Sequence, residues 1–332
     1  MTTSSNLTTL EGAPARAALQ VLAPVEDYRF PEGWMAPASA PFRARQCCAR
    51  LEEGRVLFLD RIPFDFPRED REFLLAQRQS GSKLHKNVSY RPRADIIRGA
   101  AGPRADVDRL HQIMRRYSAE TVRFLGELLA PYAAHWSLDY ASYRPEEEKG
   151  RDLPVHKRND LLHVDAFPTR PMHGRRILRC FTNINPRAAR VWHTTDGFET
   201  LAHKYADEAG LRDFAARSHT RAHPLLSGVK RMLGFKAPDH SAYDKFMLRF
   251  HDFLKERADF QQSCPKTRIE FPPCSTWICF TDSVPHAVLS GQFALEQTFI
   301  IPVQALVTPE RAPIRILEKI AGARLAPHHE QI

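Results

Sequence analysis

A chain of 332 residues is long enough for one elaborated domain or two small ones, and its 43% hydrophobic and 26% charged residues are ordinary for a globular protein. No stretch has the roughly 18–20 uncharged apolar residues that a membrane-spanning helix needs, and residues 1–20 lack the pattern of a signal peptide. Lysine and arginine outnumber aspartate and glutamate by 48 to 39, which favours an anionic partner: nucleic acid, a phosphate-rich substrate or an acidic membrane surface.

The first half of the chain is predicted to be mainly helical after a loose N-terminal arm. Residues 1–40, rich in Ser, Thr, Ala and Pro, are expected to form that arm. The run VLFLDRIPFDF predicts a strand followed by a turn, and Pro67 is expected to begin a short helix with acidic residues in its first turn. The clearest helix is predicted at 106–131, where apolar residues recur at helical spacing, a pattern typical of core packing.

The second half is predicted to be rich in strands. Segments with many β-branched and aromatic residues, bounded by Pro, Gly or Ser, occur at 161–167, 175–186, 275–282, 286–290 and 293–306. A helical insert is expected at about 187–265, and within it Ser241 is a suitable N-cap for a helix. This order predicts an α+β protein whose jelly-roll core comes mainly from 155–186 and 270–306, with flanking N-terminal helices, so that 41–332 form a single domain.

His163 and Asp165 are the residues with the clearest chemical meaning. On a strand, residues i and i+2 point to the same face, so one imidazole and one carboxylate are expected to converge. The pattern is short, and His328-His329-Glu330 repeats a His-x-acid in the polar tail. His286, which follows a Ser-Val-Pro turn and begins a later strand, is the obvious third metal ligand. Two histidines and one carboxylate form the facial triad of non-haem Fe(II) oxygenases, and a zinc hydrolase can use the same ligands.

Three blocks of sequence carry a resemblance to a known family. They are HKNVSYRPRADIIRG at 85–99, HVDAFPTRPMHGRRILRCFTNINP from His163, and PPCSTWICFTDSVPHAVLSGQFALEQTFIIP around His286. Together they resemble the Kdo hydroxylases, a branch of the Fe(II)- and 2-oxoglutarate-dependent dioxygenases. The resemblance implies a double-stranded β-helix core, with iron held by His163, Asp165 and His286. It also implies that O2 and 2-oxoglutarate are consumed to hydroxylate C3 of a Kdo sugar in the Kdo-lipid A of lipopolysaccharide.

The co-substrate 2-oxoglutarate needs a cation that this sequence lacks in the usual place. Many members of the superfamily carry an arginine shortly after the distal histidine, whereas here that stretch reads Leu295-Glu296-Gln297-Thr298. A buried dicarboxylate without a cationic partner is costly, so we expect Arg179 to pair with its far carboxylate. Arg176 is the alternative, nearer the turn and expected to be more exposed, and Thr298 is expected to add a hydroxyl contact.

Basic residues are expected to contact the acidic substrate and the membrane that holds it. Lys86, Arg91 and Arg170 are predicted to meet the carboxylates and phosphates of a Kdo-lipid A head group. Residues 223–238 interleave apolar residues with Lys230, Arg231 and Lys236, a pattern that in a helix predicts peripheral binding to an anionic bilayer. The expected location is therefore the cytoplasm, with peripheral attachment to the inner membrane.

Three alternative functions differ in what they require of the sequence. A dioxygenase of the same fold could act on another substrate, such as a protein side chain or a small lipid. A nucleic-acid-binding barrel would need a continuous basic face with interleaved aromatic residues, whereas this chain scatters its charge, so no nucleic-acid partner is expected. A cupin-like metal-binding protein without catalysis would lack any group for 2-oxoglutarate. The sequence does not predict an oligomeric state.

Overall fold

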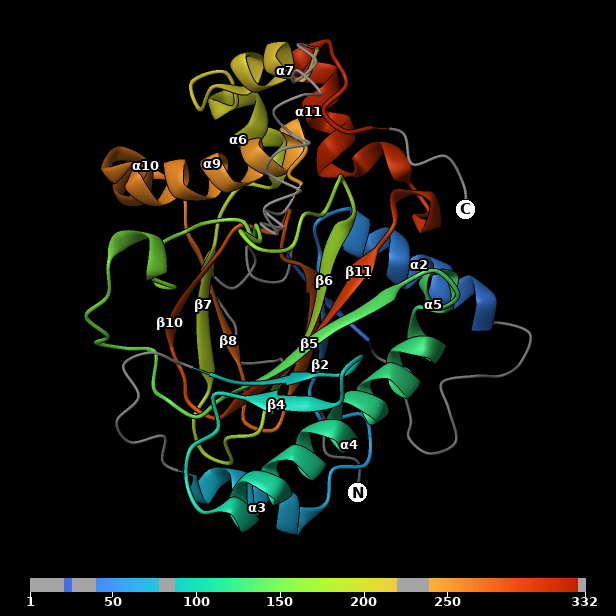
Figure 1. The fold of residues 1–332 in the computed structure, drawn as a ribbon, viewed down its shortest axis with the longest axis vertical. Coiled ribbons are helices and arrows are strands. Elements are labelled where there is room, and N and C mark those ends of the chain that lie inside the picture. The colour runs from blue at the N-terminus through green and yellow to red at the C-terminus, as the bar shows by residue number, and fades with distance from the viewer. Residues whose placement is uncertain (1–20, 26–39, 78–86, 220–238, 328–332) are drawn as a thin grey trace, which may run out of the picture.

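The protein combines two β-sheets with two groups of helices (Figure 1). The computed structural model describes residues 21–25, 40–77, 87–219 and 239–327. Lys86 and the predicted membrane-binding segment 223–238 lie outside these residues, so the predictions made for them stay predictions. No helix in the described ranges is both long enough and apolar enough to cross a membrane.

The larger sheet has eight strands in the order β1-β2-β9-β6-β11-β5-β3-β4. It is mixed, because β1 pairs with β2 in parallel while the other neighbours pair antiparallel. In sheet order the strands are β1 (Leu22–Pro24), β2 (Val56–Leu59), β9 (Thr276–Phe280), β6 (Arg176–Asn183), β11 (Ala294–Ile301), β5 (Ser137–Arg144), β3 (Val88–Arg91) and β4 (Ile96–Arg98).

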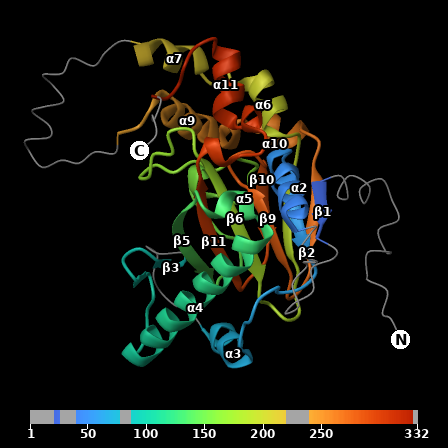
Figure 2. The same cartoon turned by 90° about the vertical axis from the view of Figure 1, so that its right-hand side faces the viewer.

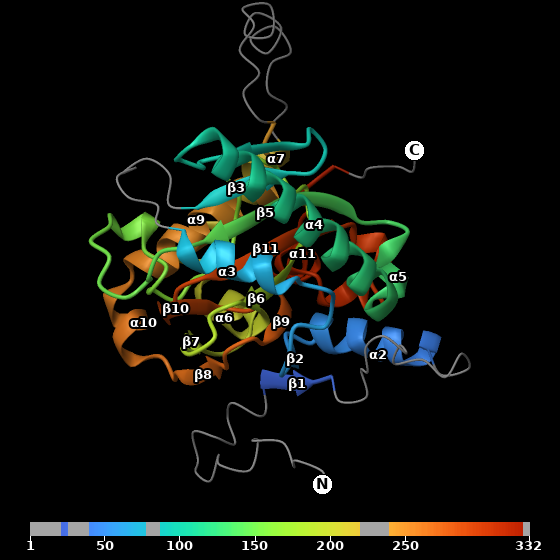
Figure 3. The same ribbon diagram turned by 90° about the horizontal axis from the view of Figure 1, so that it is seen from below.

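The smaller sheet is antiparallel, in the order β10-β7-β8, and packs against the larger one (Figure 3). Its strands are β10 (His286–Ser290), β7 (Arg190–Thr194) and β8 (Thr267–Phe271). Aromatic side chains from both sheets fill the space between them: the Trp192 ring of β7 lies 5.1 Å from Phe181 of β6, and Phe271 of β8 stacks on Trp277 of β9 at 4.0 Å. Such ring pairs bury large apolar areas, so they hold the two sheets together.

One group of helices covers the outer face of the larger sheet (Figure 2). It includes α2 (Ala40–Glu52), α4 (Arg104–Leu128) and α5 (Ala130–Ala133), and α3 (Arg68–Ala76) lies near the start of α4. The buried stripe of α4, which runs from Leu110 to Leu128, faces the sheet, and Ser118 donates a hydrogen bond to Gln297 of β11 at 2.7 Å. The structure therefore confirms the predicted long helix and its core-facing side.

A second group of helices lies across one end of the sheets, at the top of Figure 1. It consists of α6 (Phe198–Tyr205), α7 (Leu211–His219), α9 (Ala242–Glu256), α10 (Ala258–Ser263) and α11 (Pro313–Ala321). Short 3-10 helices occur at η2 (Val155–Lys157), η3 (Val303–Ala305) and η4 (Pro309–Arg311). Ser241 caps α9 as predicted, and the Asp244 carboxylate accepts a hydrogen bond from the Ser241 backbone N–H, completing a capping box.

Several predicted boundaries were wrong, each for a physical reason. Residues 161–167 do not form a strand, because only His163 makes a bridge, with His286. Two residues later the N–H of Asp165 donates instead to the carbonyl of Thr281. The predicted strand 293–306 ends at Ile301, because Pro302 has no N–H to continue the ladder. The segment 187–265 is not helical throughout, because Arg190–Thr194 pairs as β7 inside the smaller sheet.

The N-terminal half holds elements that the sequence patterns did not predict. Within the expected loose arm, Leu22–Pro24 is an ordered edge strand paired with β2. The helix Ala40–Glu52 and the strands β3, β4 and β5 were also missed. Strand β5 is the most important of these for function, because it carries polar side chains into the space between the two sheets.

Candidate metal centre

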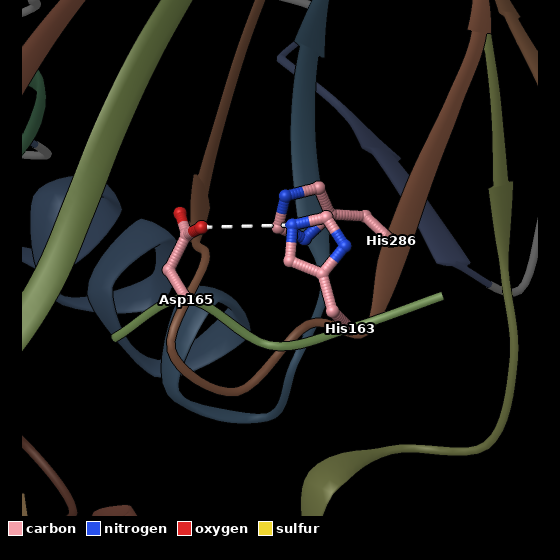
Figure 4. Close-up of side chains that lie close together, drawn as sticks. All are labelled: His163, Asp165 and His286. Atoms are coloured by element: carbon pink, nitrogen blue, oxygen red, sulfur yellow. Dashed lines mark ion pairs between the residues drawn. The ribbon is translucent and has the colours of Figure 1, made fainter. Parts of the chain in front are cut away.

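His163, Asp165 and His286 converge in the structure (Figure 4). One potential ligand atom from each residue lies within 4.8 Å of the others, and Nε2 of His163 is 3.8 Å from Oδ1 of Asp165. Both histidines are buried and Asp165 is nearly so. Two donor atoms that each lie about 2.0–2.2 Å from one ion are at most about 4.4 Å apart, so the three side chains converge on one site and need only a small movement to share a metal.

The backbone brings the three residues together without a regular strand. The N–H of His163 donates to the carbonyl of His286 at 3.2 Å, and the reverse bond is 2.9 Å long. Two residues later, the N–H of Asp165 donates to the carbonyl of Thr281 at 2.8 Å. The segment is thus tied at both ends of the His-x-Asp motif, and its side chains converge as the i, i+2 rule predicted.

Hydrogen bonds fix both imidazoles with the same ring nitrogen turned inward. Nδ1 of His163 lies 2.7 Å from the carbonyl of Leu161, and Nδ1 of His286 lies 2.9 Å from that of Val284. A carbonyl oxygen only accepts, so each Nδ1 carries the proton and each Nε2 keeps a free lone pair. This arrangement is typical of histidines that bind a metal through Nε2.

The charges of the three side chains also suit a metal. Burial lowers the pKa of His163 and of His286, so both imidazoles are neutral at neutral pH. Burial alone would raise the pKa of Asp165, but the nearby Arg179 guanidinium favours the ionised carboxylate, and the pKa lies well below its ordinary value. Neutral imidazoles and an ionised carboxylate are the forms that coordinate metal ions.

A cavity of about 40 Å³ adjoins the triad between the two sheets. Arg179 on β6 connects the triad to this cavity: its Nη2 lies 3.3 Å from Oδ2 of Asp165, and its Nη1 lies 3.1 Å from Oε1 of Glu296 on β11. Arg144 on β5 pairs with the other oxygen of Glu296 at 2.6 Å. Besides the triad, the cavity is lined by Arg144, Asn159, Arg179, Phe181, Arg190, Trp192 and Val288.

Glu148 extends this network to a third arginine. Its Oε1 lies 3.3 Å from Nη2 of Arg190 and 3.8 Å from Nη1 of Arg144, while the more exposed Arg151 approaches its other oxygen at 3.6 Å. Burial lowers the pKa of Arg190 to about 10, so it stays protonated at neutral pH. We call Arg144, Arg179, Arg190, Asp165, Glu148 and Glu296 the buried charge cluster; its three cations balance its three anions.

The sequence matches a family model for 3-deoxy-D-manno-oct-2-ulosonic acid (Kdo) hydroxylase over residues 35–324. The chain belongs to the Kdo hydroxylase family. This confirms the resemblance seen in the sequence.

Solved structures of one family member are similar to this Kdo hydroxylase over nearly its whole length. KdoO, a non-heme Fe(II) alphaketoglutarate dependent dioxygenase in complex with alphaketoglutarate and Fe(III), is 31% identical, with 94% of this chain and 99% of that chain covered and a TM-score of 0.76. KdoO in complex with cobalt(II) is 32% identical, with coverages of 94% and 100% and a TM-score of 0.78. No curated protein sequence matches the chain.

The structure places Arg179 and Thr298 of this Kdo hydroxylase side by side. They are cross-strand partners in the pairing of β6 with β11, and the Thr298 hydroxyl donates to Oε1 of Glu296 at 3.3 Å. Arg176 lies elsewhere: it is fully buried, pairs with Asp282 at 2.8 Å and does not line the triad cavity. The expectation that Arg176 is exposed was therefore wrong.

Arg91 and Arg170, predicted to contact substrate, meet at one aromatic ring. Their guanidinium carbons lie 4.8 and 4.3 Å from the centre of the Tyr140 ring. Arg170 also lies 4.0 Å from the centre of the Phe167 ring and pairs with Asp139 at 2.7 Å. Both arginines are thus held at one site by rings rather than spread over a loop.

Sequence reasoning missed several residues that shape the centre. His251 of α9 packs edge-on against His163, with ring centres 4.9 Å apart, and its Nδ1 lies 2.8 Å from the carbonyl of Val164. Arg144, Glu148 and Arg190 were missed as well. No local pattern marks them, because their roles depend on strand pairing and on contacts between distant segments.

Proposed function

We propose that this Kdo hydroxylase is an Fe(II)- and 2-oxoglutarate-dependent dioxygenase that hydroxylates C3 of a Kdo sugar in Kdo-lipid A. The observation that carries the proposal is the triad, with two neutral imidazoles presenting Nε2 and one ionised carboxylate beside them. Two histidines and one carboxylate are the ligand set of non-haem Fe(II) oxygenases. Family membership and the iron and alphaketoglutarate bound by KdoO point to the same chemistry.

The core is proposed to be a double-stranded β-helix within a single domain at 41–332. The central order β9-β6-β11-β5 of the larger sheet faces β10-β7-β8 of the smaller one. The segment from Asn159 to His163 runs beside β10, since Val288 donates to the carbonyl of Asn159 at 2.7 Å and His163 bridges His286. Counting that segment as an eighth strand gives two four-stranded layers, the layout of a jelly roll.

His163, Asp165 and His286 would hold the iron, and the buried charge cluster would receive 2-oxoglutarate. When bound, Fe(II) supplies the oxidation, in which O2, 2-oxoglutarate and the sugar C–H yield succinate, CO2 and the sugar C–OH. Arg179, with Thr298 beside it, is proposed to bind the far carboxylate of 2-oxoglutarate, because its guanidinium lies next to Asp165 and lines the cavity. A divalent cation and a dicarboxylate bring opposite and equal charge, so together they leave the buried charge cluster balanced.

The substrate is proposed to be held by basic residues gathered around the Tyr140 ring. Arg91 and Arg170 are available there, and Lys86 remains predicted for the same role. Since Kdo-lipid A is anchored in a membrane by its acyl chains, we also propose peripheral contact of the protein with the anionic inner membrane, on its cytoplasmic side.

The test is succinate formation with Fe(II), 2-oxoglutarate and O2, with and without Kdo-lipid A, alongside the mass of the lipid product. We expect succinate to form in a one-to-one ratio with a product that has gained one oxygen atom on Kdo. A His163→Ala variant is the matched control and should form neither product. Succinate formation that does not respond to Kdo-lipid A, with no change in lipid mass, would instead indicate another substrate.

A further inference from the structure

A second arginine-rich site lies beside the metal centre, in a pocket of about 390 Å³. It contains four arginines, Arg91, Arg93, Arg170 and Arg175, and one carboxylate, Asp139. We call these five residues, with Tyr140, the arginine pocket. Its formal charge is four cations minus one anion, or +3, which differs sharply from the balanced buried charge cluster.

Three of the four arginines have no carboxylate partner among the described residues. Asp139 pairs with Arg170 alone, at 2.7 Å. Arg175 donates only to neutral carbonyls, from Nε to Met172 at 2.9 Å and from Nη2 to Pro171 at 3.1 Å, so its charge is not cancelled. Burial lowers the pKa of Arg175, and the cation of nearby Arg93 lowers it further, against the opposing effect of Asp244.

The pocket also holds buried donors without acceptors. The Nε atoms of Arg91 and Arg170 are buried and have no hydrogen-bond partner in the described part of the chain. A buried donor left unpaired costs free energy, and burial of several like charges adds to that cost. An oxyanion in the pocket would remove both costs, because guanidinium groups match the oxygens of phosphates and carboxylates.

Aromatic rings hold the cations in place. Tyr140 lies between Arg91 and Arg170, with their guanidinium carbons 4.8 and 4.3 Å from its ring centre. In the loop that follows Arg170, the backbone N–H groups of Met172 and His173 donate to the carboxylate of Asp244 at 2.6 and 3.0 Å. The loop that supplies Arg170 and Arg175 is therefore fixed before any ligand binds.

A short series of contacts joins the arginine pocket to the metal centre. The guanidinium of Arg170 lies 4.0 Å from the centre of the Phe167 ring, and that of Arg179 lies 5.4 Å from the same ring. Arg179 in turn pairs with the metal ligand Asp165 at 3.3 Å. Arg175 and Asp165 also line one small cavity. The two sites are therefore neighbours, with the Phe167 ring in contact with an arginine from each.

We propose that the arginine pocket binds a second oxyanion of the substrate molecule whose acidic sugar reacts at the metal centre. This inference rests on the proposed function. The oxyanion is either a phosphate monoester of the lipid A part or the carboxylate of another Kdo unit, since the same guanidinium chemistry receives both. None of the four arginines touches the triad, so the pocket affects substrate affinity rather than the chemical step.

Equilibrium binding of Kdo-lipid A to protein loaded with Co(II) and 2-oxoglutarate is the primary test. The Arg91→Gln/Arg93→Gln double variant should weaken binding about tenfold or more, because hydrogen bonds to charged groups are lost. Arg93→Gln alone, at an exposed position, should weaken it by a smaller factor. Arg98→Gln is the matched control, since Arg98 is an exposed arginine of neighbouring β4 that does not line the pocket, and it should bind like the wild type.

Two modified substrates distinguish the sources of the oxyanion. If a phosphate occupies the pocket, enzymatic removal of the lipid A phosphates should weaken wild-type binding about tenfold and leave the double variant unaffected. If the carboxylate of another Kdo unit occupies the pocket, a substrate with one Kdo unit should bind the wild type about tenfold more weakly than a substrate with two. The double variant should bind these two substrates equally. The proposal is overturned if the double variant binds like Arg98→Gln, or if every substrate loses affinity equally in wild type and variant.

Turnover separates this proposal from the proposed function. With wild-type protein, intact binding of Kdo-lipid A without succinate formation would contradict the dioxygenase proposal and leave the pocket proposal standing. With the double variant, we expect a higher KM for Kdo-lipid A and a kcat within about twofold of the wild type. This is the result for an interaction that stabilises the bound substrate and the transition state equally. A lower kcat with unchanged KM would contradict the pocket proposal.

Discussion

The buried charge cluster and the arginine pocket are both rich in arginine, yet they differ in how their charges are balanced. In the cluster, Arg144, Arg179 and Arg190 each lie within 3.3 Å of a buried carboxylate. In the pocket, Arg170 alone has such a partner among the residues that the structure describes. The comparison teaches that a balanced site suits ligands whose charges cancel, such as the proposed divalent metal with a dicarboxylate, whereas an unbalanced site suits an anion alone.

The two regions also differ in size and in the elements that supply them. The cavity of the cluster measures about 40 Å³, and the arginine pocket about 390 Å³. Strands from both sheets supply the cluster, whereas a hairpin, the start of β5 and the loop at 170–175 supply the pocket. The small site suits a metal and a small co-substrate, and the large one suits part of a bulky substrate.

The largest expected effect comes from removing a metal ligand. This tests whether the buried charge cluster adjoins a metal site. His163→Ala, Asp165→Ala or His286→Ala should each abolish stable metal binding and reduce turnover below detection, because a facial triad has no spare ligand. Metal content and circular dichroism check this, and the secondary structure should survive. His156→Ala, at an exposed histidine, is the control. A ligand variant with wild-type metal content and activity would show that the triad is not the metal site.

The next effect separates co-substrate binding from substrate binding. Arg179→Leu should raise the KM for 2-oxoglutarate far more than that for Kdo-lipid A, since truncation of one partner of a buried charge pair costs about 2–5 kcal/mol. Steady-state kinetics with each substrate varied in turn measures both values. Arg158→Leu, at a more exposed arginine that pairs with Asp160, should change neither. If the KM for 2-oxoglutarate stays unchanged, another arginine of the cluster binds its far carboxylate.

The free energy of unfolding tests whether Asp244 holds the loop that supplies Arg170 and Arg175 to the arginine pocket. Asp244→Ala removes the acceptor for the backbone N–H groups of Met172 and His173, so we expect the free energy of unfolding to fall by about 3 kcal/mol. Urea denaturation measures this change, and Lys245→Ala on the exposed side of the same helix is the control. A loss no larger than the control's would mean that Asp244 does not hold the loop.

The smallest expected effect concerns the cap of α9. Ser241 accepts a hydrogen bond from the N–H of Asp244 at 3.2 Å, and Ser241→Ala should lower the free energy of unfolding by about 1 kcal/mol. The same denaturation experiment detects this, and Ser241→Thr, which retains a hydroxyl that can both accept from the Asp244 N–H and donate to its carboxylate, should restore most of the loss. An alanine variant as stable as the wild type would show that the cap contributes nothing.

The triad was predictable because its geometry is mostly local. His163 and Asp165 are two positions apart in an extended segment, and His286 begins a strand, so residue spacing and strand patterns were enough to bring them into one hypothesis. The exact secondary structure mattered less: the segment at 161–167 is held by one bridge and one further backbone hydrogen bond rather than a ladder, yet the side chains still converge.

The buried charge cluster was only partly predictable, because its pairs join distant parts of the chain. Arg144 meets Glu296 only because β5 pairs with β11, and β5 has a mixed, mostly half-buried pattern that does not indicate a strand. Arg190 meets Glu148 only because β7 lies inside a segment that was predicted to be helical. Such pairs depend on sheet order, which single-sequence periodicity does not contain.

Titration of 2-oxoglutarate into the protein, with and without Co(II), tests the central claim most directly. If the buried charge cluster takes a metal and a dicarboxylate together, 2-oxoglutarate should bind at least about tenfold more tightly with Co(II), and Co(II) should gain the same factor from 2-oxoglutarate. Calorimetry measures both couplings, and the Asp165→Ala variant should lose them. Equal affinity for 2-oxoglutarate in the presence and absence of Co(II) would contradict the account.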